Sequence, residues 1–127
     1  MKDLIISTLI ILLLIFVWVL FDGYSYQTTY ALSDIIDEEI IPLVEDENWV
    51  VSSSIYDAFE SEWEKYKKMS LSFLENDQIN EIDLCVARAE KYIEAMDVSN
   101  SAGELCSIST QLKLLYQREK ISLSNIL

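Results

Sequence analysis

The chain begins with one continuous apolar segment, followed by a longer region in which apolar and polar positions alternate at helical spacing. Leu4 to Phe21 contains no charged side chain, and as an α-helix it would span about 27 Å, close to the thickness of a bilayer core. Beyond it, apolar residues recur every three or four positions, which is typical of amphipathic helices. The pattern predicts an all-α protein, with a transmembrane helix over residues 1–22 followed by a small antiparallel helical bundle over residues 23–127.

The bundle is predicted to contain four helices. Their expected ranges are 28–41, 46–74, 80–97 and 101–118. Pro42 is expected to end the first helix near Ile41, because proline removes a backbone donor and crowds the preceding turn. Ser101 is expected to cap the last helix, because Glu104 three residues later completes the pattern of a capping box.

The same periodicity predicts the core. In the first two helices the inward positions are Leu32, Ile35, Ile36, Ile40, Leu43, Val44, Trp49, Ser52, Tyr56, Phe59, Trp63, Tyr66, Ser70 and Phe73. In the last two they are Ile79, Ile82, Val86, Ala89, Ile93, Met96, Leu105, Ile108, Leu112 and Leu115. The aromatic stripe of the second helix is interpreted as core packing rather than as a ligand platform. Cys85 and Cys106 fall out of register in the predicted hairpin, so we expect both thiols to stay free.

The charge distribution is strongly acidic and uneven. The formal net charge is −13, from 22 acidic and 9 basic residues, and no Lys or Arg occurs between Gly23 and Glu64. Phosphate binding needs a cationic surface, so nucleic acid is excluded as a partner. The same balance argues against adhesion to anionic lipid headgroups. The acids are interpreted as a solvated face of the bundle.

The apolar segment is interpreted as a retained anchor rather than a cleaved signal. It is longer than a signal h-region, and Asp22 and Gly23 follow it without a small-residue cleavage site. Lys2 precedes the segment, and the next basic residue after it is Lys65. The positive-inside rule then predicts a single-pass protein of the cell membrane, with a cytoplasmic N-terminus and an extracytoplasmic bundle.

The residues offer little catalytic chemistry. Without His, the chain lacks the Ser–His–Asp and Cys–His arrangements, and with two Gly residues it lacks a glycine-rich phosphate loop. We therefore expect no enzyme activity, no cofactor and no metal site. Arg88 is expected to form an ion pair across the bundle. The candidate interaction surface consists of Asp37, Glu38, Glu45, Asp46, Trp49 and Arg88.

Several short motifs, taken in order, resemble a known family. They include Glu47-Asn48-Trp49, Glu62-Trp63-Glu64-Lys65, Glu81-Ile82-Asp83, Tyr92-Ile93-Glu94-Ala95 and Leu123-Ser124-Asn125-Ile126-Leu127. With the N-terminal anchor, they make the chain resemble domain-of-unknown-function family 4363, small anchored helical proteins of Gram-positive bacteria. The resemblance covers nearly the whole chain. It implies a topology and a source, and it implies no activity.

The function predicted from these features is binding. We expect the helical domain to bind a protein partner as an accessory subunit of a membrane or envelope complex. The alternative is sensing of a small molecule or cation in a pocket between the helices. Two further classes of function remain. One is self-association into a homo-oligomer, and the other is a carboxylate hydrolase that acts on the envelope. A hydrolase would need two acidic side chains in one cleft.

Overall fold

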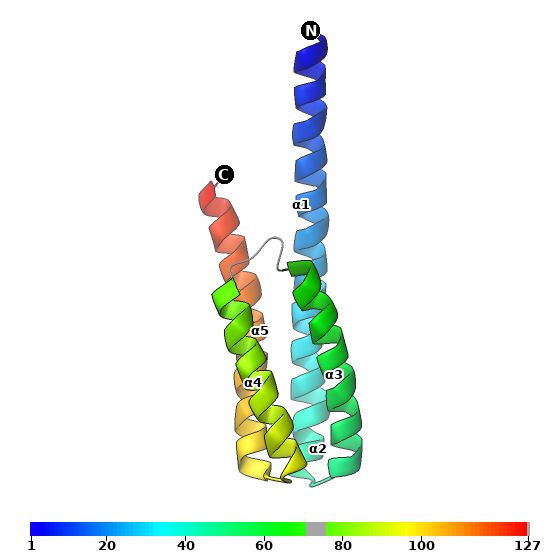
Figure 1. Ribbon diagram of the computed structural model, residues 1–127, viewed down its shortest axis with the longest axis vertical. Coiled ribbons are helices and arrows are strands. Elements are labelled where there is room, and N and C mark those ends of the chain that lie inside the picture. The colour runs from blue at the N-terminus through cyan, green and yellow to red at the C-terminus, as the bar shows by residue number, and fades with distance from the viewer. Residues whose placement is uncertain (71–75, 127) are drawn as a thin grey trace.

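The computed structural model describes residues 1–70 and 76–126, and they form an all-helical protein (Figure 1). The elements are α1 (Lys2–Asp34), the π-helix η1 (Ile35–Ile40), α2 (Ile41–Glu45), α3 (Trp49–Ser70), α4 (Asn76–Glu94) and α5 (Val98–Ile126). This confirms the predicted fold class: a long apolar N-terminal helix followed by packed helices.

The first helix and its continuation form one column of a four-helix bundle (Figure 1). α1, η1 and α2 descend from the N-terminus, α3 returns, α4 descends and α5 returns. α5 packs against both α1 and α4, and α3 packs against α4 and the lower part of the first column. We call the end that holds the α2–α3 and α4–α5 turns the distal end, because it lies farthest from the N-terminal part of α1.

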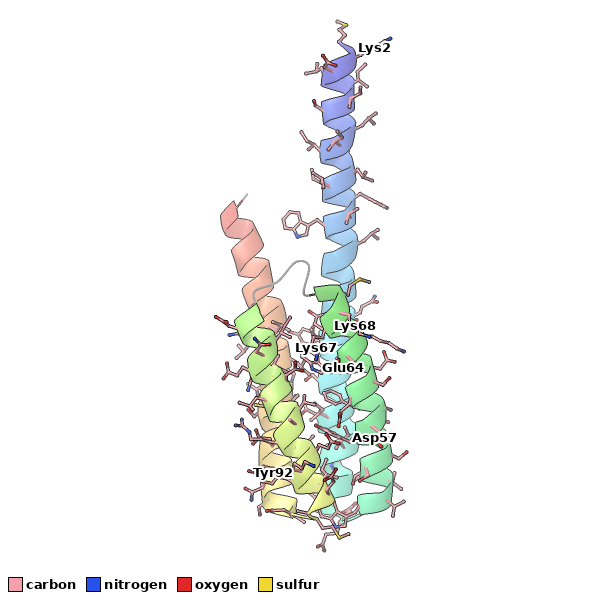
Figure 2. The ribbon with its side chains drawn as sticks, in the orientation of Figure 1. Lys2, Asp57, Glu64, Lys67, Lys68 and Tyr92 are labelled. Atoms are coloured by element: carbon pink, nitrogen blue, oxygen red, sulfur yellow. The ribbon has the colours of Figure 1, made fainter. Side chains whose placement is uncertain are left out.

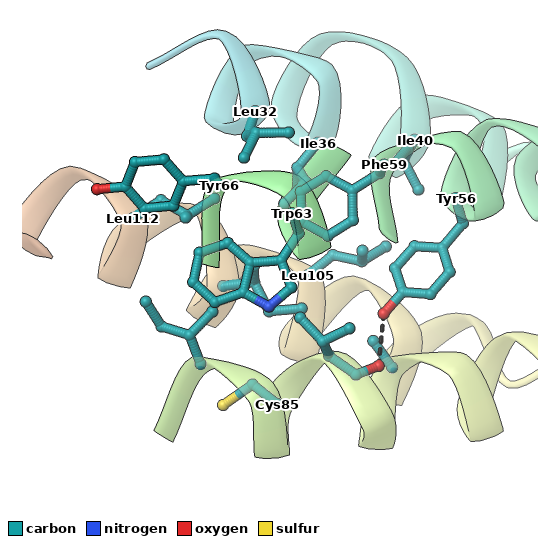
Figure 3. Packing of buried hydrophobic residues seen from close by; sticks show 14 of the residues in the cluster. Leu32, Ile36, Ile40, Tyr56, Phe59, Trp63, Tyr66, Cys85, Leu105 and Leu112 are labelled. Atoms are coloured by element: carbon teal, nitrogen blue, oxygen red, sulfur yellow. Dashed lines mark hydrogen bonds between the residues drawn. The ribbon is translucent and has the colours of Figure 1, made fainter. Parts of the chain in front are cut away.

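The core lies along the bundle axis and is built largely from the predicted positions (Figure 3). Its buried residues are Leu32, Ile36, Ile40, Val44, Tyr56, Phe59, Trp63, Tyr66, Ile79, Ile82, Cys85, Val86, Ala89, Ile93, Leu105, Ile108, Leu112 and Leu115. Ile35 and Trp49 pack at its edge. Cys85 is buried, although it was not among the predicted core residues. Met96 was predicted to be in the core, but it is exposed. The Ser70 side chain and Phe73 lie outside the described residues.

Pro42 was expected to end the first helix near Ile41, and this prediction is wrong. The six-residue π-helix η1 ends immediately before α2, and Pro42 falls in the first turn of α2. A π-helical turn changes the hydrogen-bond spacing. The missing proline N–H therefore falls at the start of a new helical segment, where proline is tolerated. The column stays continuous from Lys2 to Glu45.

Two residues in the left-handed conformation set the boundaries at the distal end. Glu47 has φ 58° and Met96 has φ 56°. At each turn the next N–H reaches back five residues, from Asn48 to the carbonyl of Leu43 at 2.9 Å and from Asp97 to that of Tyr92 at 3.0 Å. These are Schellman motifs. The second bundle helix therefore begins at 49 rather than 46, and the third ends at 94 rather than 97.

The last two helices also begin earlier than predicted. α4 starts at 76 rather than 80, and α5 starts at 98 rather than 101 and runs to 126 rather than 118. Asp97 caps α5, because its Oδ1 accepts the N–H of Asn100 at 3.1 Å. Ser101 lies inside the helix, and its buried hydroxyl has no hydrogen-bond partner among the described residues.

Alanine substitutions at Asp97 and at Ser101 should change the free energy of unfolding differently. Asp97→Ala should lower the free energy of unfolding by about 1 kcal/mol, because the Asn100 N–H loses its acceptor. Ser101→Ala should leave it unchanged or raise it by up to about 1 kcal/mol, because it removes an unsatisfied buried hydroxyl. Urea unfolding followed by circular dichroism measures both. Destabilisation by Ser101→Ala alone would restore Ser101 as the cap.

Candidate functional site

The distal end carries the exposed apolar side chains of the bundle's turns. We define the distal surface by Glu45, Asp46, Trp49, Val50 and Met96. Val50 is 84% exposed and Met96 is 63% exposed, whereas Trp49 is half-buried and packs against the core. The two turns that supply these residues lie at the same end of the bundle (Figure 1).

Met96 is exposed and has a backbone conformation that is unfavourable for a side chain with a Cβ atom. A side chain with a Cβ atom in the left-handed region costs about 1–2 kcal/mol, and glycine or asparagine is the usual residue at this position of a Schellman motif. Met96 ends α4 in this conformation, and its side chain gains no burial in the core to offset the cost. An observed backbone outlier of this kind is a basis for proposing a function.

Negative charge surrounds these apolar residues. Glu45, Asp46 and Glu47 lie on the α2–α3 turn and are exposed, as is Glu94 at the end of α4. Hydrogen bonds from the backbone and side chain of Asn100 lower the pKa of Asp97 and keep its carboxylate charged. The distal end therefore combines apolar contact area with a negative electrostatic potential.

A second acidic surface follows the face of α3 and α4. Burial, and then the nearby charges of Glu90, Asp57, Glu64 and Glu94, raise the pKa of Glu60 to about 7. Its buried Oε1 has no hydrogen-bond partner among the described residues. Asp57 and Glu64, labelled in Figure 2, lie on the same helix one turn before and after it. The repulsion among these carboxylates is a cost that the fold carries at neutral pH.

Toward the other end of α3 and α4, a polar cluster joins the two helices. The indole Nε1 of Trp63 donates to Asp83 at 2.7 Å, and the ammonium of Lys67 donates to the second oxygen of Asp83 at 3.0 Å. Lys67 also pairs with Glu64 at 2.8 Å (Figure 2). This cluster orients Trp63 in the core and fixes α3 against α4.

The aromatic stripe of α3 is core packing, as predicted. Tyr56, Phe59, Trp63 and Tyr66 are all fully buried. Burial raises the pKa of the Tyr56 phenol well above its ordinary value, so it stays protonated and donates to the carbonyl of Val86 (Figure 3). No open surface is lined by these rings, which removes the aromatic lining that the ligand-sensing alternative needed.

The structure separates the six residues of the predicted interaction surface. Glu45, Asp46 and Trp49 meet at the distal end. Asp37 pairs with Lys113 of α5 at 3.2 Å, and Arg88 pairs with Glu104 of α5 at 2.8 Å. The pairing of Arg88 is the ion pair expected across the bundle.

The remaining predicted residue, Glu38, lies exposed on η1. Sequence reasoning missed Val50 and Met96. Val50 follows Trp49 without a pattern of its own, and Met96 fits the spacing of the core so well that it was assigned there. Glu47 was named only within a family motif, although its backbone ends a helix.

Among residues 1–70 and 76–126, no group of three His, Cys, Asp or Glu side chains is placed to bind a metal ion. Cys85 is buried, Cys106 is exposed, and both thiols are free. The amide of Gln111 donates to the sulfur of Cys85 at 3.4 Å. The α4–α5 register therefore places Cys85 beside Gln111 rather than beside Cys106.

Lys2–Leu20 is long and apolar enough to cross a membrane, and nothing in the bundle buries it. A signal sequence near the N-terminus can meet the same criteria of length and composition. These properties therefore show an N-terminal apolar helix and do not show whether it is retained or cleaved. The bundle begins shortly after this segment, since Thr29 is the first fully buried residue of α1 that the structure describes.

An N-terminal apolar helix followed by an acidic four-helix bundle defines the class of protein. The family model described as a domain of unknown function, DUF4363, matches residues 24–126, and the chain belongs to this family. The match covers the bundle and leaves out the apolar segment. Comparisons with curated proteins and with solved structures gave no match.

Glu60 predicts a pH dependence of stability. Because its pKa is raised to about 7 on folding, the folded state binds more protons than the unfolded chain between the ordinary glutamate pKa and about 7. Stability should therefore fall as pH rises through this window, by about 1 kcal/mol after allowance for solvent screening. Glu60→Gln should flatten this dependence and raise the free energy of unfolding above pH 7.

The matched control is Glu62→Gln, an exposed neighbour on the same helix that pairs with Lys65. Urea unfolding at several pH values between about 5 and 8 compares the variants. A pH dependence that is identical in wild type and Glu60→Gln would show that Glu60 does not titrate in this window.

Proposed function

We propose that this protein is a single-pass membrane protein whose bundle binds a protein partner, as an accessory subunit of a membrane or envelope complex. The role is binding rather than catalysis. The observation that supports it most directly is Met96, an exposed apolar side chain on a left-handed backbone position at the end of the bundle farthest from the anchor.

The partner contact is assigned to the distal surface. Val50 and Met96 provide apolar contact area on two neighbouring turns, and exposed acids flank them. Interfaces of this kind combine a few apolar anchors with a polar rim. The partner surface that complements them is an apolar patch surrounded by Lys or Arg.

The topology follows from the anchor. We propose that Lys2–Leu20 is retained in the cell membrane with the N-terminus in the cytoplasm. Lys2 lies at the N-terminal end of the span, and the next basic residue is Lys65, which favours an extracytoplasmic bundle by the positive-inside rule. The stiff first column then holds the distal surface away from the bilayer.

Substitution of Met96 separates binding from stability. Met96→Gly should raise the free energy of unfolding by about 1 kcal/mol, because glycine adopts the left-handed conformation without strain. The same variant should lower partner capture severalfold, because it removes an apolar anchor. The measurements are thermal unfolding of the full-length protein and site-specific photo-cross-linking from position 50 in native membranes, with mass spectrometry of the product.

Two controls make the result specific. Glu47→Gly relieves the same strain at the other turn and keeps Met96, so it should gain stability and lose less capture than Met96→Gly. A photo-cross-linker at Leu84, which is 55% exposed on the side of α4, should not capture the partner. Unchanged capture by Met96→Gly, or recovery of only a second copy of this chain from position 50, would contradict the proposal.

A further inference from the structure

The first column buries side chains at a constant interval of four residues. Leu32, Ile36, Ile40 and Val44 are each at most 2% exposed, and the first three point into the core in Figure 3. In a regular α-helix each residue turns the chain by about 100°, so an interval of four overshoots a full turn by about 40°. Three such intervals would direct Val44 about 120° away from Leu32. An unbroken α-helix would therefore leave Val44 at the edge of the core.

The π-helix η1 removes this drift. The N–H of Ile41 bonds to the carbonyl of Ile36, five residues earlier, so the turn holds more residues than an α-helical turn. The column therefore carries a surplus residue before Val44, compared with α-helical geometry. The surplus lies on the outer side, where the three consecutive acids at 37–39 are exposed.

The sequence also supports a second arrangement of the distal part of the column. In an all-α column Leu43 would lie about 20° around the helix from Leu32, and it would take the inward place of Val44. Leucine is larger than valine and has the higher helix propensity, so the core would still receive an apolar side chain. Leu43 is already half-buried. The exchange would rotate the end of the column by about 100° and carry Glu45 and Asp46 with it.

Pro42 selects between the two arrangements. In an all-α column it would be an interior residue, and its ring would crowd the carbonyl of Glu38, four residues earlier. An interior proline disfavours a helix by on the order of a hundredfold. In the structure Pro42 instead follows the π-helical turn, at the start of α2, where proline is tolerated.

Contacts with α5 fix the part of the column that precedes the proline. The hydroxyls of Ser33 and Ser109 share a buried hydrogen bond at 2.7 Å, and Asp37 pairs with Lys113 at 3.2 Å. Both contacts lie on the N-terminal side of Glu38. A change of register would therefore leave α1 in place and be taken up by the distal turn.

We propose that η1 and Pro42 form a two-register switch in the first column. The π register buries Val44, and the all-α register buries Leu43. Pro42 holds the π register, and the register sets the direction in which the α2–α3 turn presents its acids. Elements with two discrete packed arrangements are a general basis of conformational switching. This switch depends neither on the binding of a partner nor on retention of the anchor.

Thiol labelling of the full-length protein in detergent micelles tests the two registers. The background is Cys85→Ala with Cys106→Ser, which removes the native thiols. Single cysteines are introduced as Leu43→Cys or Val44→Cys, each with Pro42 retained and with Pro42→Ala. Cysteine is small and apolar, so it suits both an inward and an outward position. The rate of reaction with a maleimide reports the exposure of each thiol.

With Pro42 present, position 43 should react severalfold faster than position 44, because Val44 is fully buried and Leu43 is not. Pro42→Ala should raise the ratio of the rate at 44 to the rate at 43 severalfold. An unchanged ratio would overturn the proposal, whether both rates stay constant or both rise together through fraying. Ile36→Cys should stay unreactive and Val50→Cys reactive in both backgrounds.

A second measurement needs no labelling. Val44→Ala leaves a cavity in the core while Pro42 holds Leu43 outward, whereas Leu43 can turn into that space when Pro42 is replaced by alanine. The drop in the thermal unfolding midpoint caused by Val44→Ala should therefore be severalfold smaller in the Pro42→Ala background. Ile36→Ala, before the proline, should lower the midpoint equally in both backgrounds. Equal drops for Val44→Ala would contradict the two registers.

Discussion

One continuous helix determines where everything else in this protein lies. The column from Lys2 to Glu45 begins as an apolar segment and ends as one wall of the core, to which it contributes Leu32, Ile36 and Ile40. Because a helix is stiff, the column transmits the position of its first half to the other three helices. Its continuity depends on the π-helical turn before Pro42, since a break at the proline would detach the distal turn from the axis.

Periodicity predicted the parts of this fold that depend on local burial. Residues such as Trp63, Ile82 and Leu112 repeat at helical spacing, and a helix that buries one face must place them inward. The predicted helix boundaries were wrong where the backbone conformation of a single residue ends the helix. Glu47 and Met96 end helices in a conformation that usually selects glycine, so neither carried a recognisable signal.

The candidate site was predictable to a similar and limited extent. The acids of the distal end were identified, because charge is visible in the sequence. The exposed apolar residues were not, since exposure depends on where a helix ends against its neighbours. The prediction of the α5 cap was wrong for a related reason. Ser101 with Glu104 has the pattern of a capping box, but the Schellman turn before α5 places Asp97 at the cap.

The length of the column restricts the partners that the distal surface can meet. About 25 residues separate Leu20 from Glu45, which is close to 37 Å of helix, so an anchored bundle presents Val50 and Met96 far from the bilayer. Membrane proteins with only short extracytoplasmic loops do not reach that height. Under the proposed function, a membrane partner would therefore have to reach this height with a folded domain of its own.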